Sequence, residues 1–340
     1  MQKEIWIDMI NPSHPLFFHP LVSEIKKDYN ITVTLRDRGE TVKLAKFLGL
    51  NGRVYGRDFE EPIKKILSMI NRTIILSCSV KHFDYSISFE NPMSVFISKL
   101  RNQKSILLLD NDVKYKADSI FFQSLESKIK LFADTIIIPQ ACEEAFRRHR
   151  QKNELKIYNG YKEDFYIADY QPDETVLKKL PFQDYIIIRG EAPNSFYVNK
   201  TSSILPQLFH LFTKENINIL FLPRDKSDYS YPETEKISIL KEPINGLDLI
   251  NFSNVVLTGS GTMAREAACM GKTAVSFYPS DELLSVDAQL IKEGKIFHSR
   301  DPKEIVEYVL MNFNKKTTLK LERSKKVKKE ILNIIKSCIE

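Results

Sequence analysis

The most informative part of the sequence is Asn254-Val-Val-Leu-Thr-Gly-Ser-Gly-Thr-Met-Ala-Arg-Glu-Ala-Ala-Cys-Met-Gly-Lys-Thr-Ala-Val-Ser276. Its apolar beginning predicts a buried strand that ends near Thr258, and the pattern from Gly261 to Gly271 predicts a helix. Glycines let a backbone approach a ligand closely, and the free N–H groups and the dipole at the start of a helix attract anions. The segment therefore predicts an anion-binding turn between a strand and a helix.

The side chains around this turn favour a nucleoside diphosphate. The turn contains Gly259, Ser260, Gly261 and Thr262, whose N–H groups and hydroxyls can donate to phosphate oxygens. Glu266 lies one turn into the helix. A carboxylate there would repel phosphates, but it could accept hydrogen bonds from both hydroxyls of a ribose. A turn without a ligand would use glycine only to bend the chain and threonine only as a cap, and it leaves the glutamate unexplained.

Short apolar runs alternate with helical patterns along the whole chain, which is typical of parallel sheets covered by helices. In the first half, strands are predicted near Glu4–Met9, Ile31–Leu35, Tyr85–Phe89, Ser105–Leu109 and Thr135–Ile138. In the second half, they are predicted near Asp184–Arg189, Asn216–Leu222, Lys236–Leu240, Asn254–Thr258 and Thr273–Phe277. Helices are predicted near Leu16–Asp28, Thr41–Leu48 and Pro92–Arg101, and Arg72–Val80 is assigned to a helix that begins near Glu61.

The length of 340 residues suits two domains. We expect an N-terminal domain over residues 1–160, a connection over 161–182, a C-terminal domain over 183–314 and a basic helix over 315–340. The fold class is then α/β, with two Rossmann-like, doubly wound parallel-sheet domains that face a central cleft. Ligands of such sheets bind beyond the carboxyl ends of the strands, so the site is sought in the loops that follow strands.

Composition limits the classes of protein to consider. The chain is 43% hydrophobic and 28% charged, as in ordinary globular proteins, and charged or polar residues interrupt every apolar run before it could span a bilayer. The N-terminus enters a strand-like pattern at once, without the features of a signal peptide. The four cysteines are scattered and form no C-x-x-C pair, which predicts reduced thiols in a cytoplasmic protein.

The net charge of +6 is concentrated near the C-terminus, where eight lysines and arginines lie between Lys315 and Lys329. A basic amphipathic helix of this kind could touch the inner face of an anionic membrane. The simpler interpretation is a solvated terminal helix. No interleaved basic and aromatic motif is present, so we expect no nucleic-acid partner.

A second group of candidate residues begins with His14, in the loop Ile7-Asp-Met-Ile-Asn-Pro-Ser-His14 between the first predicted strand and the first helix. His14 could act as a base or donate to a phosphate, or it could merely bond to the backbone. His19 lies further into the helix and is interpreted as structural.

Acidic residues follow two other strands of the first half. Glu90 follows Tyr85–Phe89, and Asp110 and Asp112 follow Ser105–Leu109, so Glu90 and Asp112 join His14 as catalytic candidates. The two neighbouring aspartates supply too few oxygen ligands for a hard cation, and we expect no metal.

Two arginines at predicted strand ends of the second half complete the nucleotide site. Arg189 and Arg224 could neutralise a diphosphate, or they could form surface ion pairs. The loop after the next strand could reach the sugar through Asp281 or Asp287.

The turn and helix closely resemble the donor-binding element of glycosyltransferase-B enzymes and of the non-hydrolysing UDP-N-acetylglucosamine 2-epimerases. This resemblance implies that Ser260, Gly261 and Thr262 hold the diphosphate and that Glu266 holds the ribose. In lipid-linked sugar transferases of this fold, a histidine follows the first strand in a glycine-rich loop. Here Asn11-Pro12-Ser13 replaces the glycines, which argues against phosphate binding by the loop itself.

From Trp6 to about Asp301, the chain resembles an uncharacterised, largely archaeal family of glycosyltransferase-B-like proteins, catalogued as a domain of unknown function. The matching segments are Ile7-Asp8-x-x-Asn11-Pro12-x-His14, Arg36-Asp37-x-Gly39-x-Thr41-Val42, Asp110-Asn111-Asp112, Leu222-Pro223-Arg224-Asp225, Gly259-x-Gly261-Thr262-Met263-Ala264-Arg265-Glu266 and His298-x-x-Asp301-Pro302.

These observations favour a metal-independent glycosyltransferase that uses a nucleotide-diphosphate sugar, with UDP as the expected nucleotide, and a glycan or lipid acceptor. No cofactor is expected besides this substrate. One alternative is a nucleotide-sugar 2-epimerase, in which Glu90 and Asp112 would handle the proton at C2 of the sugar. The other is a protein that binds nucleotide sugars without turnover.

Overall fold

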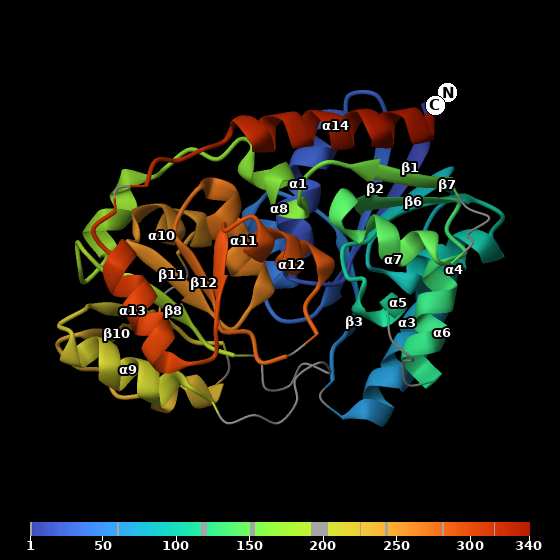
Figure 1. Ribbon diagram of the computed structural model, residues 1–340. Coiled ribbons are helices and arrows are strands. Elements are labelled where there is room, and N and C mark those ends of the chain that lie inside the picture. The colour runs from blue at the N-terminus through green and yellow to red at the C-terminus, as the bar shows by residue number, and fades with distance from the viewer. Residues whose placement is uncertain are drawn as a thin grey trace. The chain divides into compact units, whose positions relative to one another are not determined.

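The computed structural model describes residues 2–59, 61–116, 121–149, 154–191, 203–224, 226–241, 244–280, 282–315 and 317–340. The chain divides into two compact units (Figure 1). Unit 1 comprises Met1–Tyr166 and Lys326–Glu340, and unit 2 comprises Ile167–Lys325. Each unit is built on one parallel sheet with helices on its faces, which confirms the predicted fold class.

Unit 1 contains a seven-stranded sheet, sheet A, in the order β3-β2-β1-β4-β5-β6-β7. Its strands are β1 (Glu4–Met9), β2 (Asn30–Asp37), β3 (Arg53–Arg57), β4 (Tyr85–Phe89), β5 (Lys104–Leu108), β6 (Thr135–Pro139) and β7 (Glu154–Tyr158). All neighbours pair in parallel, so the carboxyl ends of the strands meet at one edge. The central strands are almost continuously buried because helices cover both faces.

The helices of unit 1 are α1 (Ser13–Ile25), α2 (Thr41–Phe47), α3 (Pro62–Ser79), α4 (Pro92–Leu100), α5 (Val113–Lys116), α6 (Phe121–Lys130), α7 (Glu143–Arg147) and α8 (Lys162–Ile167), whose last residue opens unit 2. Right-handed crossovers place α1 and α2 on one face of sheet A. The same rule places α3, α4 and α6 on the opposite face, because their connections run across the sheet in the other direction.

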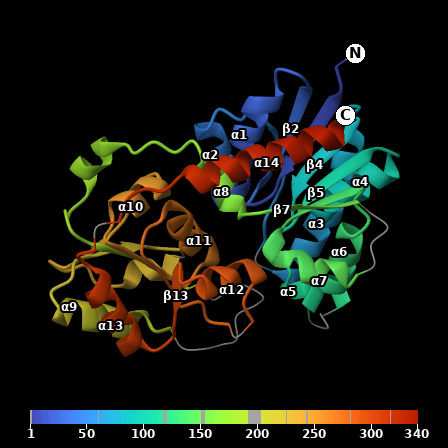
Figure 2. The same cartoon turned by 45° about the horizontal axis from the view of Figure 1, so that its top comes forward.

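The C-terminal helix α14 (Glu322–Ile339) differs from the predicted solvated helix, because one of its faces is buried. Val327, Ile331, Ile335 and Ile339 are all at most 2% exposed. The helix runs along unit 1 beside α1 and α8 (Figure 2). The backbone of Ile339 accepts a hydrogen bond from the Lys3 ammonium, so the two ends of the chain lie side by side. Sequence alone does not show this docking, since the apolar spacing is the same for a free amphipathic helix.

Unit 2 contains a six-stranded parallel sheet, sheet B, in the order β10-β9-β8-β11-β12-β13. Its strands are β8 (Ile186–Arg189), β9 (Ile219–Leu222), β10 (Ile237–Ile239), β11 (Val255–Thr258), β12 (Ala274–Ser276) and β13 (Ile296–His298). Its helices are α9 (Leu205–Lys214), α10 (Gly246–Phe252), α11 (Gly261–Met270), α12 (Ser285–Lys292) and α13 (Pro302–Asn312). Helices α9 and α13 pack together on one face, and α10, α11 and α12 lie on the other (Figure 1).

Three strands were not predicted from the sequence, and all three lie at sheet edges: β3 and β7 in sheet A and β13 in sheet B. An edge strand is covered less completely than a central one, so its sequence carries a weaker apolar pattern. In β3, Arg-Val-Tyr-Gly-Arg, four of the five residues are exposed.

The predicted connection over residues 161–182 is only partly irregular. Its beginning forms α8, and the units change between Tyr166 and Ile167 within that helix. A 3-10 helix follows at Glu174–Lys179 in unit 2, where the side chain of Asp173 caps its start. The absence of a clean apolar period in this segment reflects two short helices, and the change of units falls within the predicted bounds.

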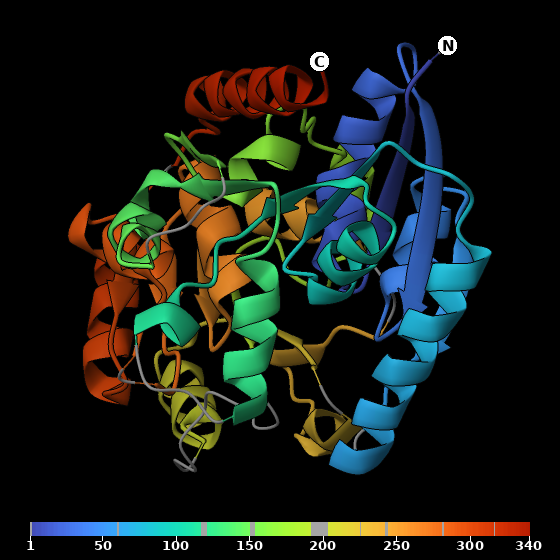
Figure 3. The same ribbon diagram turned by 90° about the vertical axis from the view of Figure 1, so that its right-hand side faces the viewer.

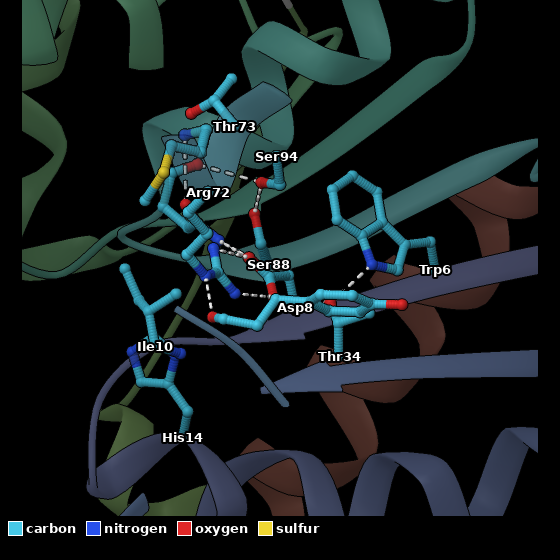
Figure 4. A network of polar contacts seen from close by, with 12 residues as sticks. Trp6, Asp8, Ile10, His14, Thr34, Arg72, Thr73, Ser88 and Ser94 are labelled. Carbon is cyan, nitrogen blue, oxygen red and sulfur yellow. Dashed lines mark hydrogen bonds and ion pairs between the residues drawn. The ribbon is translucent and has the colours of Figure 1, made fainter. Parts of the chain in front are cut away.

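A buried polar network fixes the carboxyl end of β1 in unit 1 (Figure 4). Asp8 and Arg72 are both fully buried and form a two-pronged ion pair, with N–O distances of 2.7 and 2.9 Å. Thr34 and Asn91 also donate to Asp8, at 2.6 and 2.7 Å, and the indole of Trp6 donates to Thr34 at 2.8 Å. Burial alone would raise the pKa of Asp8, but the Arg72 guanidinium and these hydrogen bonds hold it below its ordinary value.

Candidate functional site

The strand, glycine turn and helix predicted around Gly259 form as expected in unit 2. β11 ends at Thr258, α11 begins at Gly261, and Gly271 ends the helix in the left-handed conformation with φ 76°. Ser260 occupies the N-cap position, and its side chain accepts no hydrogen bond from the helix among the described residues. Instead, the N–H of Ser260 donates to the Thr258 hydroxyl at 2.9 Å, which shapes the turn. The first N–H groups of α11 are therefore not capped by the residue that usually caps them.

Close packing surrounds both glycines of the turn, with backbone beside Gly259 and the ends of side chains beside Gly261. A Cβ at Gly259 would lie 2.8 Å from the backbone Cα of Glu191, in the loop after β8. A Cβ at Gly261 would lie 2.7 Å from an Nη atom of Arg265 and 3.1 Å from a carboxylate oxygen of Asp287. The first glycine lets two loops meet at the carboxyl edge of sheet B. The second lets a guanidinium fold back against the start of α11.

This guanidinium is a part of the site that the sequence analysis did not assign. Arg265 is buried and pairs with Asp287 at 2.8 Å, and its other Nη atom lies 3.4 Å from the Thr262 hydroxyl. Asp287 comes from the first turn of α12. Asp287, which was predicted to reach the sugar, thus lies beside the turn, where its neighbour is an arginine of α11. Asp281 lies outside the described residues.

The other predicted nucleotide-binding residues lie at the same edge of sheet B. Glu266 is in α11, one turn from its start, and is 8% exposed. Arg189 ends β8, and its carbonyl accepts the N–H of Gly259 at 3.1 Å. Arg224 follows β9 and is exposed. The parallel sheet therefore brings the described nucleotide-binding candidates of unit 2 to its carboxyl edge.

Two side chains at the end of β13 and in the loop after it add to this edge. Arg300 pairs with Glu191 at 2.7 Å and donates to the Phe277 carbonyl at 2.9 Å, so it ties the loops after β8, β12 and β13 together. Burial lowers the pKa of His298, and Arg300 lowers it further, while a backbone hydrogen bond at Ser276 and the Asp287 carboxylate act in the opposite direction.

In unit 1, His14 lies in the first turn of α1, at the carboxyl edge of sheet A, and is buried. Its Nδ1 accepts the N–H of Ile10 at 3.2 Å, and its Nε2 lies 3.3 Å from the Asn11 amide nitrogen. Arg38 contacts the amide oxygen of Asn11, so the nitrogen of that amide faces the ring. Burial, with the positive charge of Lys162 nearby, lowers the pKa of His14 to about 3. His14 is therefore neutral near pH 7, and it is a weak proton acceptor.

Glu90 directly follows β4, and its carboxylate is engaged in contacts that hold the protein structure. Its backbone has a φ of 48°, which is unusual for a residue with a side chain. One carboxylate oxygen accepts the N–H groups of Asp110 and Asn111, at 3.1 and 3.0 Å, and the other pairs with Lys130 at 2.6 Å. Glu90 thus holds the loop after β5 in place, and any proton transfer by it would have to compete with these bonds.

The structure also brings a lysine to this edge that the sequence analysis had placed in the connection. Lys162, in α8, pairs with Asp110 at 2.6 Å and lies 5.4 Å from the centre of the Phe89 ring. Asp112 is fully buried. The predicted residues His14, Glu90 and Asp112 thus belong to one edge of sheet A, and Asp110 and Lys162 are additional charged members of it.

Within the described ranges, no three histidine, cysteine or carboxylate side chains come together in a way that could hold a metal ion. Among the helices of those same ranges, none has both the length and the apolar character needed to cross a membrane.

Comparison with known proteins identifies a family and a fold. The sequence model of the family described as "Protein of unknown function (DUF354)" matches residues 3–336. The uncharacterized protein MJ0665 of Methanocaldococcus jannaschii is 28% identical over 334 residues, which cover 92% of each chain. The UDP-N-acetylglucosamine 2-epimerase of Rickettsia bellii has a similar structure, with a TM-score of 0.76 at 15% identity over 99% of this chain and 97% of that one. Anabaena Alr3699/HepE in complex with UDP gives a TM-score of 0.63 at 12% identity over 98% and 100%. At these identities, the structural likeness shows the fold, which is glycosyltransferase-B-like.

Proposed function

The chain belongs to the DUF354 family, and we propose that its unit 2 binds a nucleotide-diphosphate sugar, with UDP as the nucleotide, for transfer of the sugar to a glycan or lipid acceptor. The observation that carries this proposal is the start of α11. There, two closely packed glycines, N–H groups that the Ser260 side chain does not cap and a folded-back guanidinium surround one point.

The chemistry of this point suits a diphosphate. The N–H groups of Gly261 and Thr262 and the hydroxyls of Ser260 and Thr262 can donate to phosphate oxygens, and the dipole of the ten-residue helix favours their negative charge. Glu266 then accepts hydrogen bonds from the ribose hydroxyls. This arrangement stabilises a leaving diphosphate without a metal, because fixed N–H donors and arginines do what a cation would otherwise do.

The Arg265–Asp287 pair gives this site an internal anion. The Asp287 carboxylate lies beside the start of α11, where a phosphate would be held in our proposal. A bound diphosphate would replace Asp287 as the partner of Arg265, and Arg189 and Arg224 would add further positive charge. Asp287 thereby keeps the guanidinium neutralised and oriented before the ligand binds.

In transfer, a bond forms between the acceptor oxygen and the anomeric carbon, the bond from that carbon to the diphosphate breaks, and the acceptor proton must leave. We assign the neutral His14 to hydrogen bonding, because a group with a pKa of about 3 is too weak a base for this proton. Asp110 and Asp112, after β5, are then the candidate proton acceptors of unit 1, with Lys162 beside Asp110.

A 2-epimerase is the second candidate, and the likeness to the Rickettsia bellii enzyme supports it. In that reaction the start of α11 would hold UDP while acidic residues handle the proton at C2 of the sugar. The carboxylate of Glu90 is engaged with Lys130 and two backbone N–H groups, which argues against Glu90 as the proton carrier. The same contacts support a third candidate function, binding of a nucleotide sugar without turnover.

Calorimetric titration tests the proposal. The purified protein, without added metal, is titrated with UDP, GDP, ADP, dTDP and CMP, and Glu266→Ala serves as the site variant. We expect saturable binding of UDP that weakens in the variant. Absence of binding across the whole panel would overturn the proposed site. If UDP binds, incubation with UDP-N-acetylglucosamine alone separates the reactions, because an epimerase converts the donor without an acceptor and a transferase does not.

A further inference from the structure

Helix α3 of unit 1 exposes a continuous apolar stripe. Ile63, Leu67, Ile70 and Ile74 follow one another at spacings of four, three and four residues, so they share one face of the helix. They are 74%, 60%, 54% and 59% exposed, and Ile66 beside them is 37% exposed. Single exposed apolar residues are normal in proteins, but a stripe three turns long marks an interaction surface. We call these five residues the α3 surface.

The helix is held firmly by its other face, so the stripe cannot simply turn inward. Leu76 is fully buried in a cluster with Trp6 and Phe83. The buried Arg72 holds Asp8 and also donates to the Tyr55 carbonyl in β3 at 2.7 Å. Figure 3 shows α3 in light blue at the lower right, at the margin of unit 1. The α3 surface is therefore a fixed feature of the folded unit.

Positive charge lies beside this surface. The span from Arg53 to Lys81, which contains the edge strand β3 and α3, carries six lysines and arginines against three acidic residues, and of the six Arg72 is buried against Asp8. Arg53 and Arg57 are exposed on β3, and Ser68 of α3 donates to the Arg57 carbonyl, so the strand lies directly beside the helix. Lys64 is exposed on α3, where it pairs with Glu61. An apolar stripe with cationic flanks matches the boundary between acyl chains and anionic headgroups.

We propose that the α3 surface docks unit 1 on an anionic lipid membrane, with the stripe in the interface and the flanking arginines and lysines on the headgroups. A second copy of the chain fits less well, because a two-fold contact would bring the same positive flanks together. Helix α14 also offers lysines, but its apolar face is already buried in unit 1 and has nothing left to insert. This inference is independent of the nucleotide site, which lies in unit 2.

Vesicle flotation with the full-length protein tests the docking. We expect binding to phosphatidylcholine vesicles that contain phosphatidylglycerol, weaker binding to phosphatidylcholine alone, and partial release by salt. The double variant Leu67→Asp/Ile70→Asp should bind at least roughly tenfold more weakly, because it places two charges in the stripe. Met311→Asp is the matched control, since Met311 is 70% exposed on α13 of unit 2, and it should bind like the wild type.

The α14 variant Lys326→Glu/Lys329→Glu should retain most of the binding, because those lysines are exposed outside the α3 surface. Thermal melts establish that all variants fold, since the substituted positions are exposed. The proposal is overturned if the wild type does not bind the anionic vesicles or if the α3 double variant binds as well as the wild type. It is also overturned if sedimentation shows a wild-type dimer that this double variant converts to a monomer, because the α3 surface is then a contact between copies.

Discussion

Replacing Arg72 with methionine should destabilise unit 1 strongly while leaving unit 2 folded. Methionine replaces the aliphatic stem of the arginine with an apolar side chain of similar size. It removes two hydrogen bonds to Asp8, of 2.7 and 2.9 Å, and one to the Tyr55 carbonyl. Asp8 is fully buried, so its charge would remain with only neutral donors. Breaking a buried ion pair in this way typically costs about 3–5 kcal/mol. We expect a loss of that size in the free energy of unfolding at pH 7.

The fluorescence of Trp6 can measure this loss of stability. Trp6 is the only tryptophan of the chain, it is fully buried, and its indole donates to Thr34 within the same network. Tryptophan fluorescence during urea denaturation therefore follows the unfolding of unit 1 and not of unit 2. Arg53→Met, at an exposed position of β3, is the matched control and should change the free energy by less than about 0.5 kcal/mol.

Two further measurements test the coupling between Asp8 and Arg72. The double variant Asp8→Asn/Arg72→Met should be more stable than Arg72→Met alone, because it removes the buried charge that has lost its partner. The wild-type advantage over Arg72→Met should also shrink in acid, because the folded pKa of Asp8 lies below its ordinary 3.8 and protonation abolishes the pair. A cost below about 1 kcal/mol for Arg72→Met, or additive effects in the double variant, would refute a tightly coupled pair.

Three other expected outcomes concern the two candidate sites. Gly259→Ala places a Cβ 2.8 Å from the backbone of the loop after β8, and should weaken UDP binding at least roughly tenfold in calorimetry and lower stability by about 1–3 kcal/mol. Gly246→Ala, where a Cβ meets none of the described atoms within 4 Å, should leave both unchanged. Asp287→Asn removes the internal competitor for Arg265 and should tighten UDP binding by up to roughly tenfold, so weaker binding in the same titration contradicts the exchange of partners. His14 has a pKa of about 3 when folded and 6.5 when unfolded, so stability should fall as the pH drops from 6.5 towards 3, by up to about 1.4 kcal/mol per pH unit, and His14→Gln should lack this slope. If the ring resonance of His14 itself titrates near pH 6.5 in the folded protein, the low pKa of His14 is contradicted.

Much of the architecture was predictable because it rests on local patterns. Continuous apolar runs predicted the central strands of both sheets, since strands covered on both faces need apolar side chains on both faces. The turn at Gly259 and Gly261 was also predictable, because its glycines, the preceding strand and the following helix are consecutive in the chain. Residues that share a short segment constrain one another through backbone geometry, and this information is present in the sequence.

The partners of individual charges were not predictable, because parallel crossovers bring together residues that are far apart in the chain. Asp8 and Arg72 both occur in segments assigned correctly, yet nothing local indicates that one neutralises the other inside the core. Lys162 lies in the segment predicted as the connection, and only the structure shows that α8 places it against Asp110.

The sequence by itself determined the two parallel sheets and the glycine turn that begins α11, through the periodicity of apolar residues and the conformational freedom of glycine. The tertiary structure decided which groups can carry charge or exchange protons, because ionisation depends on burial and on neighbours from other strands. It buried His14 beside Lys162, engaged Glu90 with Lys130 and set Asp287 against Arg265. It also decided which apolar side chains are covered. Both α3 and α14 are amphipathic, yet the apolar face of α14 is buried whereas the stripe of α3 from Ile63 to Ile74 remains exposed.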